Sequence, residues 1–335
     1  MGNANRIGLK AGWIVSPAFD LCFVINAWWI LVSLFPEQSV GASQQSSLAF
    51  WQIYFITTPH RWITLLLVAT DPEKRQGRTG FFLILAVIAA FVVGGARVTF
   101  GGFACLIVVE YVWNAWHFGA QHGGILRIYS LKAGGGNRWL ELNTMRLFAP
   151  YVSIRLVAEL NGWLKTHPTS ASIVSVVDVA LLAFPLILVG NEVRRFSKSR
   201  IPKLLYLLNV YAMYAAMLVC LRMGAHRALI MLTLANAAFH AVEYLAIVTY
   251  YAQKRKDSGS DSLFQRMARD WMRVIAIFII AMGVFSYLME SSQYAAVVQV
   301  FLAVNLWAAF MHYTYDGIIW KLRKPQTAKT LGVEG

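Results

Sequence analysis

The chain has 335 residues, of which 58% are hydrophobic and only 14% are charged. In a soluble globular protein about a quarter of the residues are charged, so this composition argues against a soluble fold. The charged residues, which give a net charge of +14, lie in short gaps between long apolar runs. Membrane orientation accounts for this basic excess, and no nucleic-acid partner is required. The three cysteines lie inside apolar runs and form no CxxC pair, which argues against a disulfide framework or a zinc knuckle.

The apolar runs predict an all-α fold, a polytopic transmembrane helical bundle of about ten spans. Crossing roughly 30 Å of hydrocarbon takes about 20 helical residues, and the runs are too uniformly apolar for the alternating strands of a membrane barrel. In chain order, the expected spans cover residues 12–35, 49–69, 80–98, 102–127, 147–164, 171–190, 203–221, 227–252, 271–289 and 295–320. The fifth span is the weakest, because it contains Arg155, Glu159 and Asn161.

The distribution of lysine and arginine predicts that both termini lie in the cytoplasm. If the spans alternate across the membrane, one side carries 24 of the 30 basic residues, and the positive-inside rule assigns that side to the cytoplasm. These residues are Arg6, Lys10, Lys74, Arg75, Arg78, Arg127, Lys132, Arg138, Arg146, Arg194, Arg195, Lys198, Arg200, Lys203, Lys254, Arg255, Lys256, Arg266, Arg269, Arg273, Lys321, Arg323, Lys324 and Lys329. We expect one integral membrane domain over residues 1–325 and a short cytoplasmic tail over residues 326–335.

Five of the expected spans contain ionisable side chains. Such residues are costly in lipid and usually face a bundle interior or a cavity, so they are candidates for function. In chain order they are Asp20, then His60 and Arg61, then Glu110, His117 and His122 with Asn114 and Gln121, then His240 and Glu243 with Asn236, and finally His312 and Asp316 with Asn305.

Helical spacing and depth suggest that the histidines converge. Glu110, Asn114, His117 and Gln121 recur at steps of four, three and four residues, so they share one helical face. The polar residues of the eighth and tenth spans follow the same rule. Alternating spans place His60, His117, His240 and His312 at or below the middle of the membrane, at one level. Neutral imidazole is the commonest protein ligand of iron, copper and zinc, so these four residues predict a metal centre.

Other polar residues have subsidiary roles in this interpretation. His122 is a possible fifth ligand; it lies about 140° from His117 around an ideal helix, so both reach one metal only if glycines such as Gly119 and Gly123 allow a distortion. The residues expected to orient ligands or to replace them are Asp20, Glu110, Gln121, Glu243 and Asp316. Two simpler interpretations stay open: histidines that only bond neighbouring helices, and an Asp20 that neutralises Arg61 or Arg155.

Several motifs resemble those of histidine-rich bacterial polytopic membrane proteins. The strongest is the run from His117 through Gln121 and His122 to Gly123, and the resemblance extends over nearly the whole chain. The layout is also loosely similar to the Brp/Blh-type β-carotene dioxygenases, because Pro59-His60 with Asp71 resembles a Pro-His-Gly…Asp element of that family. Arg61 stands where that element has glycine. The resemblance implies non-haem iron held by histidines from several helices, in a bacterial cytoplasmic membrane.

The expected function is that of an iron-dependent membrane oxidoreductase or oxygenase acting on an apolar, lipid-soluble small molecule. One or two non-haem iron ions would be held by His60, His117, His240 and His312, with His122 as the possible fifth ligand. Three alternatives remain open. They are an electron-transfer protein that binds haem b or copper, a proton-coupled transporter, and an accessory subunit of a larger membrane complex with an unknown electron donor or partner.

Overall fold

The computed structural model describes residues 12–33, 49–256 and 261–333, and every regular element in these ranges is a helix. The all-α prediction is therefore confirmed for the described part of the chain. Within these described ranges, six helices are long and apolar enough to cross a membrane. They are α7 (Thr79–Phe100), α11 (Pro168–Arg194), α12 (Ile201–Met223), α13 (His226–Arg255), α15 (Trp271–Glu290) and α16 (Ala295–Ile319). These helices are compatible with an integral membrane protein.

The other four expected spans have a different character. The second consists of a π-helix, η2 (Ile53–Thr57), followed by α5 (Thr58–Thr70). The fourth and fifth are α8 (Ala104–Lys132) and α9 (Arg138–Leu160), which are long helices with more polar residues. The total of ten spans and the cytoplasmic termini stay predictions, and Arg6 and Lys10 lie outside the described residues.

The first expected span is not one continuous helix, which corrects the prediction for residues 12–33. It contains α2 (Pro17–Phe19), the π-turn η1 (Asp20–Val24) and α3 (Trp29–Ser33). The chain breaks at Asn26, whose φ of 54° lies in the left-handed region. The Asn26 amide donates to the carbonyls of Phe23 (3.0 Å) and Phe239 (3.2 Å). A broken helix is tolerated in a membrane where protein groups satisfy its backbone in this way.

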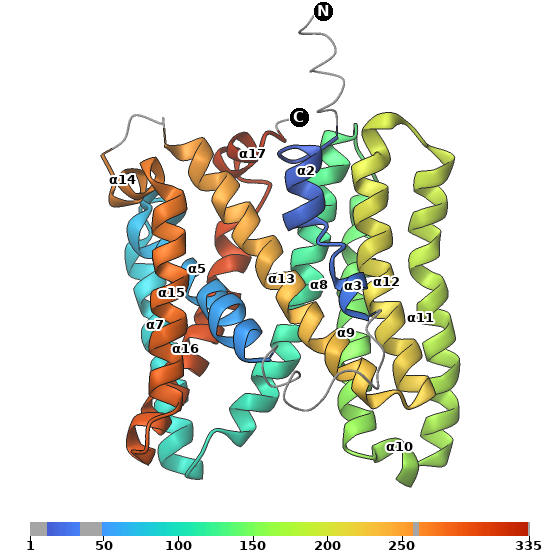
Figure 1. The fold of residues 1–335 in the computed structure, drawn as a ribbon, viewed down its shortest axis with the longest axis horizontal. Helices are drawn as coiled ribbons and strands as arrows, with labels where there is room; N and C mark the ends of the chain where they lie inside the picture. Colours follow the sequence, from blue (N-terminus) through green and yellow to red (C-terminus); the bar gives the residue numbers. More distant parts are fainter. Residues whose placement is uncertain (1–11, 34–48, 257–260, 334–335) are drawn as a thin grey trace, which may run out of the picture. The chain divides into compact units, whose positions relative to one another are not determined.

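The helices are grouped into two compact units. The first contains residues 115–243 with the N-terminal segment, and within it α9, α11 and α12 pack against one another (Figure 1). A short α10 (Trp163–Thr166) precedes α11, and the turn η3 (Lys198–Arg200) precedes α12. The second unit contains residues 46–114 and 244–334. Helices α8 and α13 each contribute residues to both units.

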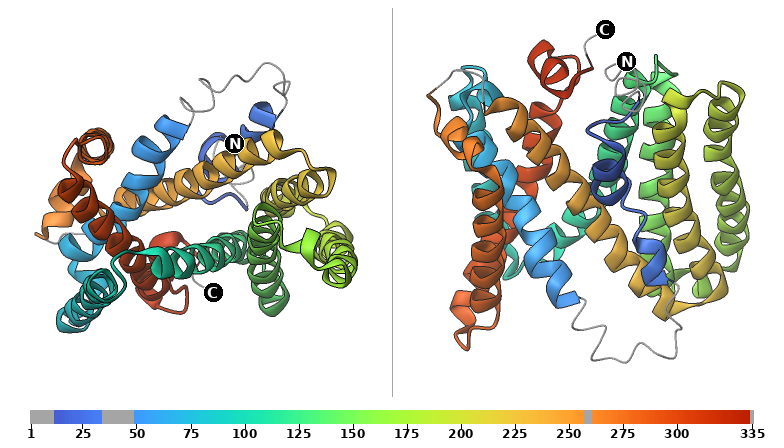
Figure 2. Two further views of the ribbon diagram at one scale, coloured as in Figure 1. Left: turned by 90° about the horizontal axis from the view of Figure 1, so that it is seen from below. Right: turned by 45° about the horizontal axis from the view of Figure 1, so that its top comes forward.

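In the second unit, α16 packs against α5, α7 and α15 (Figure 2). Its core includes Ile63 and Leu67 of α5 with Val248 of α13, all fully buried. Three short helices complete the unit: α6 (Pro72–Arg75), α14 (Leu263–Arg269) and α17 (Pro325–Leu331). Only 22% of the apolar stretch of α7 and 17% of that of α15 is buried, so most of their hydrophobic side chains face outward, as a lipid environment requires.

Candidate metal centre

His60 follows the change of helix type in the second expected span. The π-helix η2 ends at Thr57, and α5 begins directly after it with Pro59 in its first turn. π-turns are rare and are frequent at functional sites. The Thr57 carbonyl oxygen lies 3.3 Å from Nδ1 of His60. Because a carbonyl only accepts, Nδ1 carries the ring proton, and Nε2 carries the lone pair that a metal ligand needs.

His60 and His312 face each other in the second unit. Their ring centroids are 4.3 Å apart with an interplanar angle of 75°, and one nitrogen of each ring lies within 4.8 Å of the other. Both side chains are buried, at 2% and 0% exposure. Two imidazoles from separate helices, α5 and α16, are thus held close enough for one ion to contact both.

Thr64 and Asp316 determine which nitrogen of His312 carries the proton. The Thr64 hydroxyl lies 2.7 Å from Nδ1 of His312 and donates to Oδ1 of Asp316 at 3.1 Å. Tyr244 donates to the same carboxylate oxygen at 2.6 Å. With the Thr64 proton directed to Asp316, the Thr64 oxygen accepts from Nδ1–H of His312, while Nε2 of His312 lies 3.8 Å from Oδ2 of Asp316. Asp316 therefore orients a ring through a hydroxyl, as carboxylates near metal-binding histidines do.

The second pair, His117 and His240, lies in the first unit. Their ring centroids are 5.0 Å apart at 81°, one nitrogen of each ring lies within 4.8 Å of the other, and the side chains are 7% and 1% exposed. The ring of His240 stacks on Phe118 at 3.9 Å. Gln121 Nε2 donates to the His240 carbonyl (2.9 Å) and to Glu243 (2.7 Å), which ties α8 to α13 at this level. The shared face predicted for His117 and Gln121 thus meets α13.

His122 lies on α8 five residues after His117, and its polar neighbours are Tyr206 and Glu243. Its Nδ1 is 3.0 Å from the Tyr206 hydroxyl and 3.3 Å from Oε2 of Glu243, and Tyr206 donates its proton to Glu243. Nδ1 is therefore the protonated nitrogen of His122. Its Nε2 is buried with no hydrogen-bond partner among the described residues. The His122 ring centroid is 6.3 Å from that of His240, so its role as a fifth ligand stays a prediction.

Asp20 caps the broken N-terminal segment. Its carboxylate accepts from the backbone N–H groups of Ile14 (2.7 Å), Val15 (3.0 Å) and Ser16 (3.4 Å), and from the Tyr129 hydroxyl (3.0 Å). These four hydrogen bonds use its acceptor capacity. A role for Asp20 in neutralising an arginine is therefore wrong, and its main contacts are those of a structural cap.

The two arginines within the expected spans, Arg61 and Arg155, pair with other carboxylates. Arg61 contacts Glu110 at 3.2 Å, and Tyr313 donates to the same carboxylate oxygen at 2.7 Å. Arg155 bridges Glu159 (3.0 Å) and Asp178 (3.5 Å). Glu110 is thus held by a cation and a hydroxyl in the second unit, where it neutralises the charge next to His60.

Glycines in α8 serve close packing, and α8 continues through them without interruption. A Cβ atom on Gly119 would lie 2.6 Å from the Met145 carbonyl oxygen, and one on Gly123 would lie 3.2 Å from the Leu142 side chain. Helix α8 remains α-helical from Ala104 to Lys132. The distortion that His117 and His122 would need to share one metal is therefore not seen in α8, and the glycines let α8 approach α9.

Two histidines outside these groups are exposed. His167 stacks on Trp163 at 4.9 Å, and His226 begins α13. The sequence interpretation did not single out Thr64 or Tyr206. Thr64 follows His60 by four residues, so helical spacing alone could have predicted that the two share one face of α5. Tyr206 carried no such signal, because its importance depends on hydrogen bonds between helices distant in sequence.

Comparison with known proteins identifies no relative: no family model, no curated protein and no solved structure matches this chain. The function is therefore inferred from the geometry of the described residues.

Proposed function

We propose that this chain is a membrane metalloprotein in which His60, His117, His240 and His312 bind non-haem iron, and that the iron oxidises a lipid-soluble small molecule. The observation that carries the proposal is the pairing of buried imidazoles. In the pair His60 and His312, each Nδ1 lies within hydrogen-bonding distance of an oxygen atom, an arrangement that favours the tautomer with the ring proton on Nδ1 and the lone pair on Nε2. In this tautomer two buried imidazoles from separate helices offer a cation the neutral nitrogen ligands that it needs.

Helix continuity supports assigning both pairs to one centre. Helix α13 passes from the first unit into the second, and His240 precedes Tyr244 by four residues, about one turn along the same face. Side chains at this spacing have Cβ atoms about 5–6 Å apart. The Tyr244 ring lies 5.3 Å from both His60 and His312. On the basis of this spacing along α13, we assign the two histidine pairs to one centre.

The surrounding residues favour redox chemistry on an apolar substrate. Neutral imidazoles with nearby carboxylates suit iron, and the chain supplies Asp316 and Glu243 beside the rings. The protein would fix the ligand geometry and exclude water. The apolar outer surfaces of α7 and α15 fit delivery of substrate from lipid, in a bacterial cytoplasmic membrane with both termini in the cytoplasm.

Metal analysis of the purified protein tests the proposal. Protein in detergent, loaded with Fe(II) without oxygen and then desalted, should retain close to one iron per chain and have no Soret band. Nitric oxide should bind this iron and give an electron paramagnetic resonance signal, which reports an open coordination position. A Soret band would indicate haem instead, and retention of copper but not iron would indicate an electron-transfer site. Failure to retain iron, copper or zinc would refute the metal centre.

Single substitutions test the ligand set. His312→Ala and His240→Ala should each remove most of the iron, because a four-imidazole site loses affinity when either pair is broken. His167→Ala is the matched control, since this histidine is exposed, and it should keep full occupancy. If His240→Ala leaves iron at His60 and His312 unchanged, the two pairs are separate and the shared centre is wrong.

A further inference from the structure

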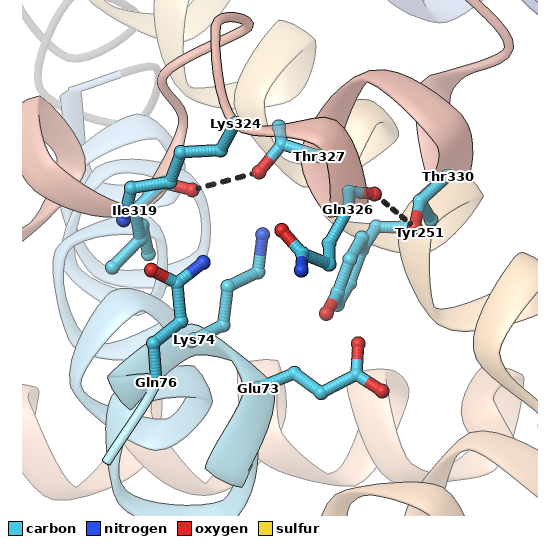
Figure 3. A pocket seen from close by; sticks show the side chains of 9 residues that line it. All are labelled: Glu73, Lys74, Gln76, Tyr251, Ile319, Lys324, Gln326, Thr327 and Thr330. Atoms are coloured by element: carbon cyan, nitrogen blue, oxygen red, sulfur yellow. Dashed lines mark hydrogen bonds between the residues drawn. The ribbon is translucent and has the colours of Figure 1, made fainter.

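A polar hollow lies in the second unit, beyond the ends of two candidate membrane helices (Figure 3). Lys74 stands five residues before the start of α7, and Lys324 five residues after the end of α16. Both lysines line the hollow. Since α7 and α16 are candidate spans, the hollow lies near the expected boundary between lipid and water.

Lys74 is an unusually buried lysine. Its side chain is 4% exposed, and its ammonium group lies over the rings of Tyr251 (3.8 Å) and Trp320 (3.6 Å). Stacked rings stabilise a cation through their faces but do not neutralise it. Figure 3 shows the ammonium end of Lys74 directed into the hollow between Gln76 and Gln326. No ion pair of Lys74 with a carboxylate is found within the described ranges.

The nearest carboxylates are already committed. Glu73, which also lines the hollow, pairs with Arg255 at 2.5 Å. Asp71 accepts from the Tyr251 hydroxyl at 2.5 Å and from the backbone N–H of Glu73 at 3.1 Å, with Arg255 at 3.8 Å. Arg255 pairs with both acids at closer range than Lys74 does, and Lys74 forms no ion pair with them, although the negative charges of Asp71 and Asp316 act on its ammonium group.

Lys324 is a second cation that lines the hollow, on the opposite side from Lys74 in Figure 3. Its Nζ is buried and makes no hydrogen bond to any residue that the structure describes. The neighbouring charges that act on it most strongly are all positive, those of Arg78, Lys321 and Arg323. A buried ammonium without acceptors is costly, and an incoming anion would supply them.

We propose that this hollow binds a phosphate group through Lys74 and Lys324, with the amides of Gln76 and Gln326 as further donors. A phosphate offers several acceptor oxygens and a charge that two ammonium groups neutralise. The position of the hollow next to two candidate spans favours the headgroup of an anionic phospholipid over free phosphate, because basic residues at the ends of spans attract such lipids.

The acid–base properties of the lysines agree with this assignment. Burial lowers the pKa of Lys74 to about 7, against the opposing negative charges of Asp71 and Asp316 and with smaller contributions from the positive charges of Lys324 and Arg255. Burial and three neighbouring cations also lower the pKa of Lys324. A bound phosphate would stabilise the charged form of both lysines, so binding would be linked to proton uptake.

Binding to delipidated protein in a non-ionic detergent tests the proposal. Dioctanoyl phosphatidate and dioctanoylglycerol differ only in the phosphate, and calorimetric titration should detect at least tenfold tighter binding of phosphatidate. Lys324→Gln and Lys74→Met should each weaken phosphatidate binding about tenfold or more, the equivalent of one charge-assisted hydrogen bond. Lys329→Gln is the matched control, because Lys329 is exposed on α17 and does not line the hollow; it should change binding less than twofold.

Each outcome decides the question. Inorganic phosphate that binds with the same dependence on Lys74 and Lys324 would identify free phosphate as the ligand, and binding of phosphatidate alone would identify the lipid headgroup. Equal losses in Lys324→Gln and Lys329→Gln would refute the site, as would equal binding of phosphatidate and dioctanoylglycerol. If Lys74→Met does not fold, Lys324→Gln still carries the test, since removing an ammonium with no hydrogen bond should not lower the melting temperature of the lipid-free protein.

Discussion

Replacing Thr64 with valine should weaken metal binding, although Thr64 is not itself a proposed ligand. Valine keeps the shape of the side chain and removes the hydroxyl. That hydroxyl lies 2.7 Å from Nδ1 of His312, 2.6 Å from the Tyr244 hydroxyl and 3.1 Å from Asp316. Thr64 has no exposed surface, so water cannot take the place of the missing hydroxyl. His312 would lose the acceptor that keeps its proton on Nδ1.

The magnitude follows from the hydrogen bonds that valine cannot make. Leaving one buried polar group without its partner costs about 1–3 kcal/mol, and removing a group that orients a metal-binding histidine typically lowers metal affinity about 10–100-fold. We therefore expect Thr64→Val to raise the dissociation constant of Fe(II) by about 10–100-fold. Thr64→Ser, which keeps the hydroxyl, should stay within a few-fold of the wild type.

Competition with a chelator of known affinity, carried out without oxygen, measures these constants. The melting temperature of each metal-free variant, recorded alongside, separates lost affinity from a general loss of structure. The reasoning would be refuted if Thr64→Val bound iron as tightly as the wild type while His312→Ala lost it, because Thr64 would then not control the ring.

Two further predictions concern stability. Gly119→Ala should destabilise the protein by about 1–3 kcal/mol, because the added Cβ would lie 2.6 Å from the Met145 carbonyl oxygen. Gly124→Ala, in open space on the same helix, should be neutral or stabilising. Thermal unfolding of both variants measures the difference, and equal effects would contradict the prediction. Because the pKa of folded Lys74 is lowered to about 7, the unfolded chain binds more protons above that pH, so stability should rise between pH 7 and 10 by at most about 1.4 kcal/mol per pH unit. The slope should disappear in Lys74→Met, and an unchanged slope would show that another group is responsible.

The candidate site was only partly predictable. The four proposed ligands were identified from histidines in expected spans at one expected depth, because ionisable residues are rare in lipid and usually have a functional role there. The partners of these histidines were harder to predict. Asp20 was expected to orient a ligand or neutralise an arginine, yet it caps backbone N–H groups in its own segment. Composition cannot distinguish these roles, because a carboxylate accepts equally well from a backbone amide and from a guanidinium.

The fold, like the candidate site, was only partly predictable from the sequence. Long apolar runs predicted α7, α11, α12, α13, α15 and α16 well, since only a helix satisfies its own backbone in lipid. The break at Asn26 was not predicted, because its backbone partner Phe239 is distant in sequence.

The sequence by itself determined the helical class, the apolar spans and the identity of the buried imidazoles, since these follow from residue type and run length. Only the tertiary structure decided which ring faces which, which nitrogen carries the proton, and that Lys74 and Lys324 line one hollow. The physical reason is that helices apolar on most sides have no single amphipathic stripe to orient them. The rotation of each helix about its own axis is set by contacts between helices. Examples are the hydrogen bond between Thr64 and His312 and the close packing of Gly119 against Met145.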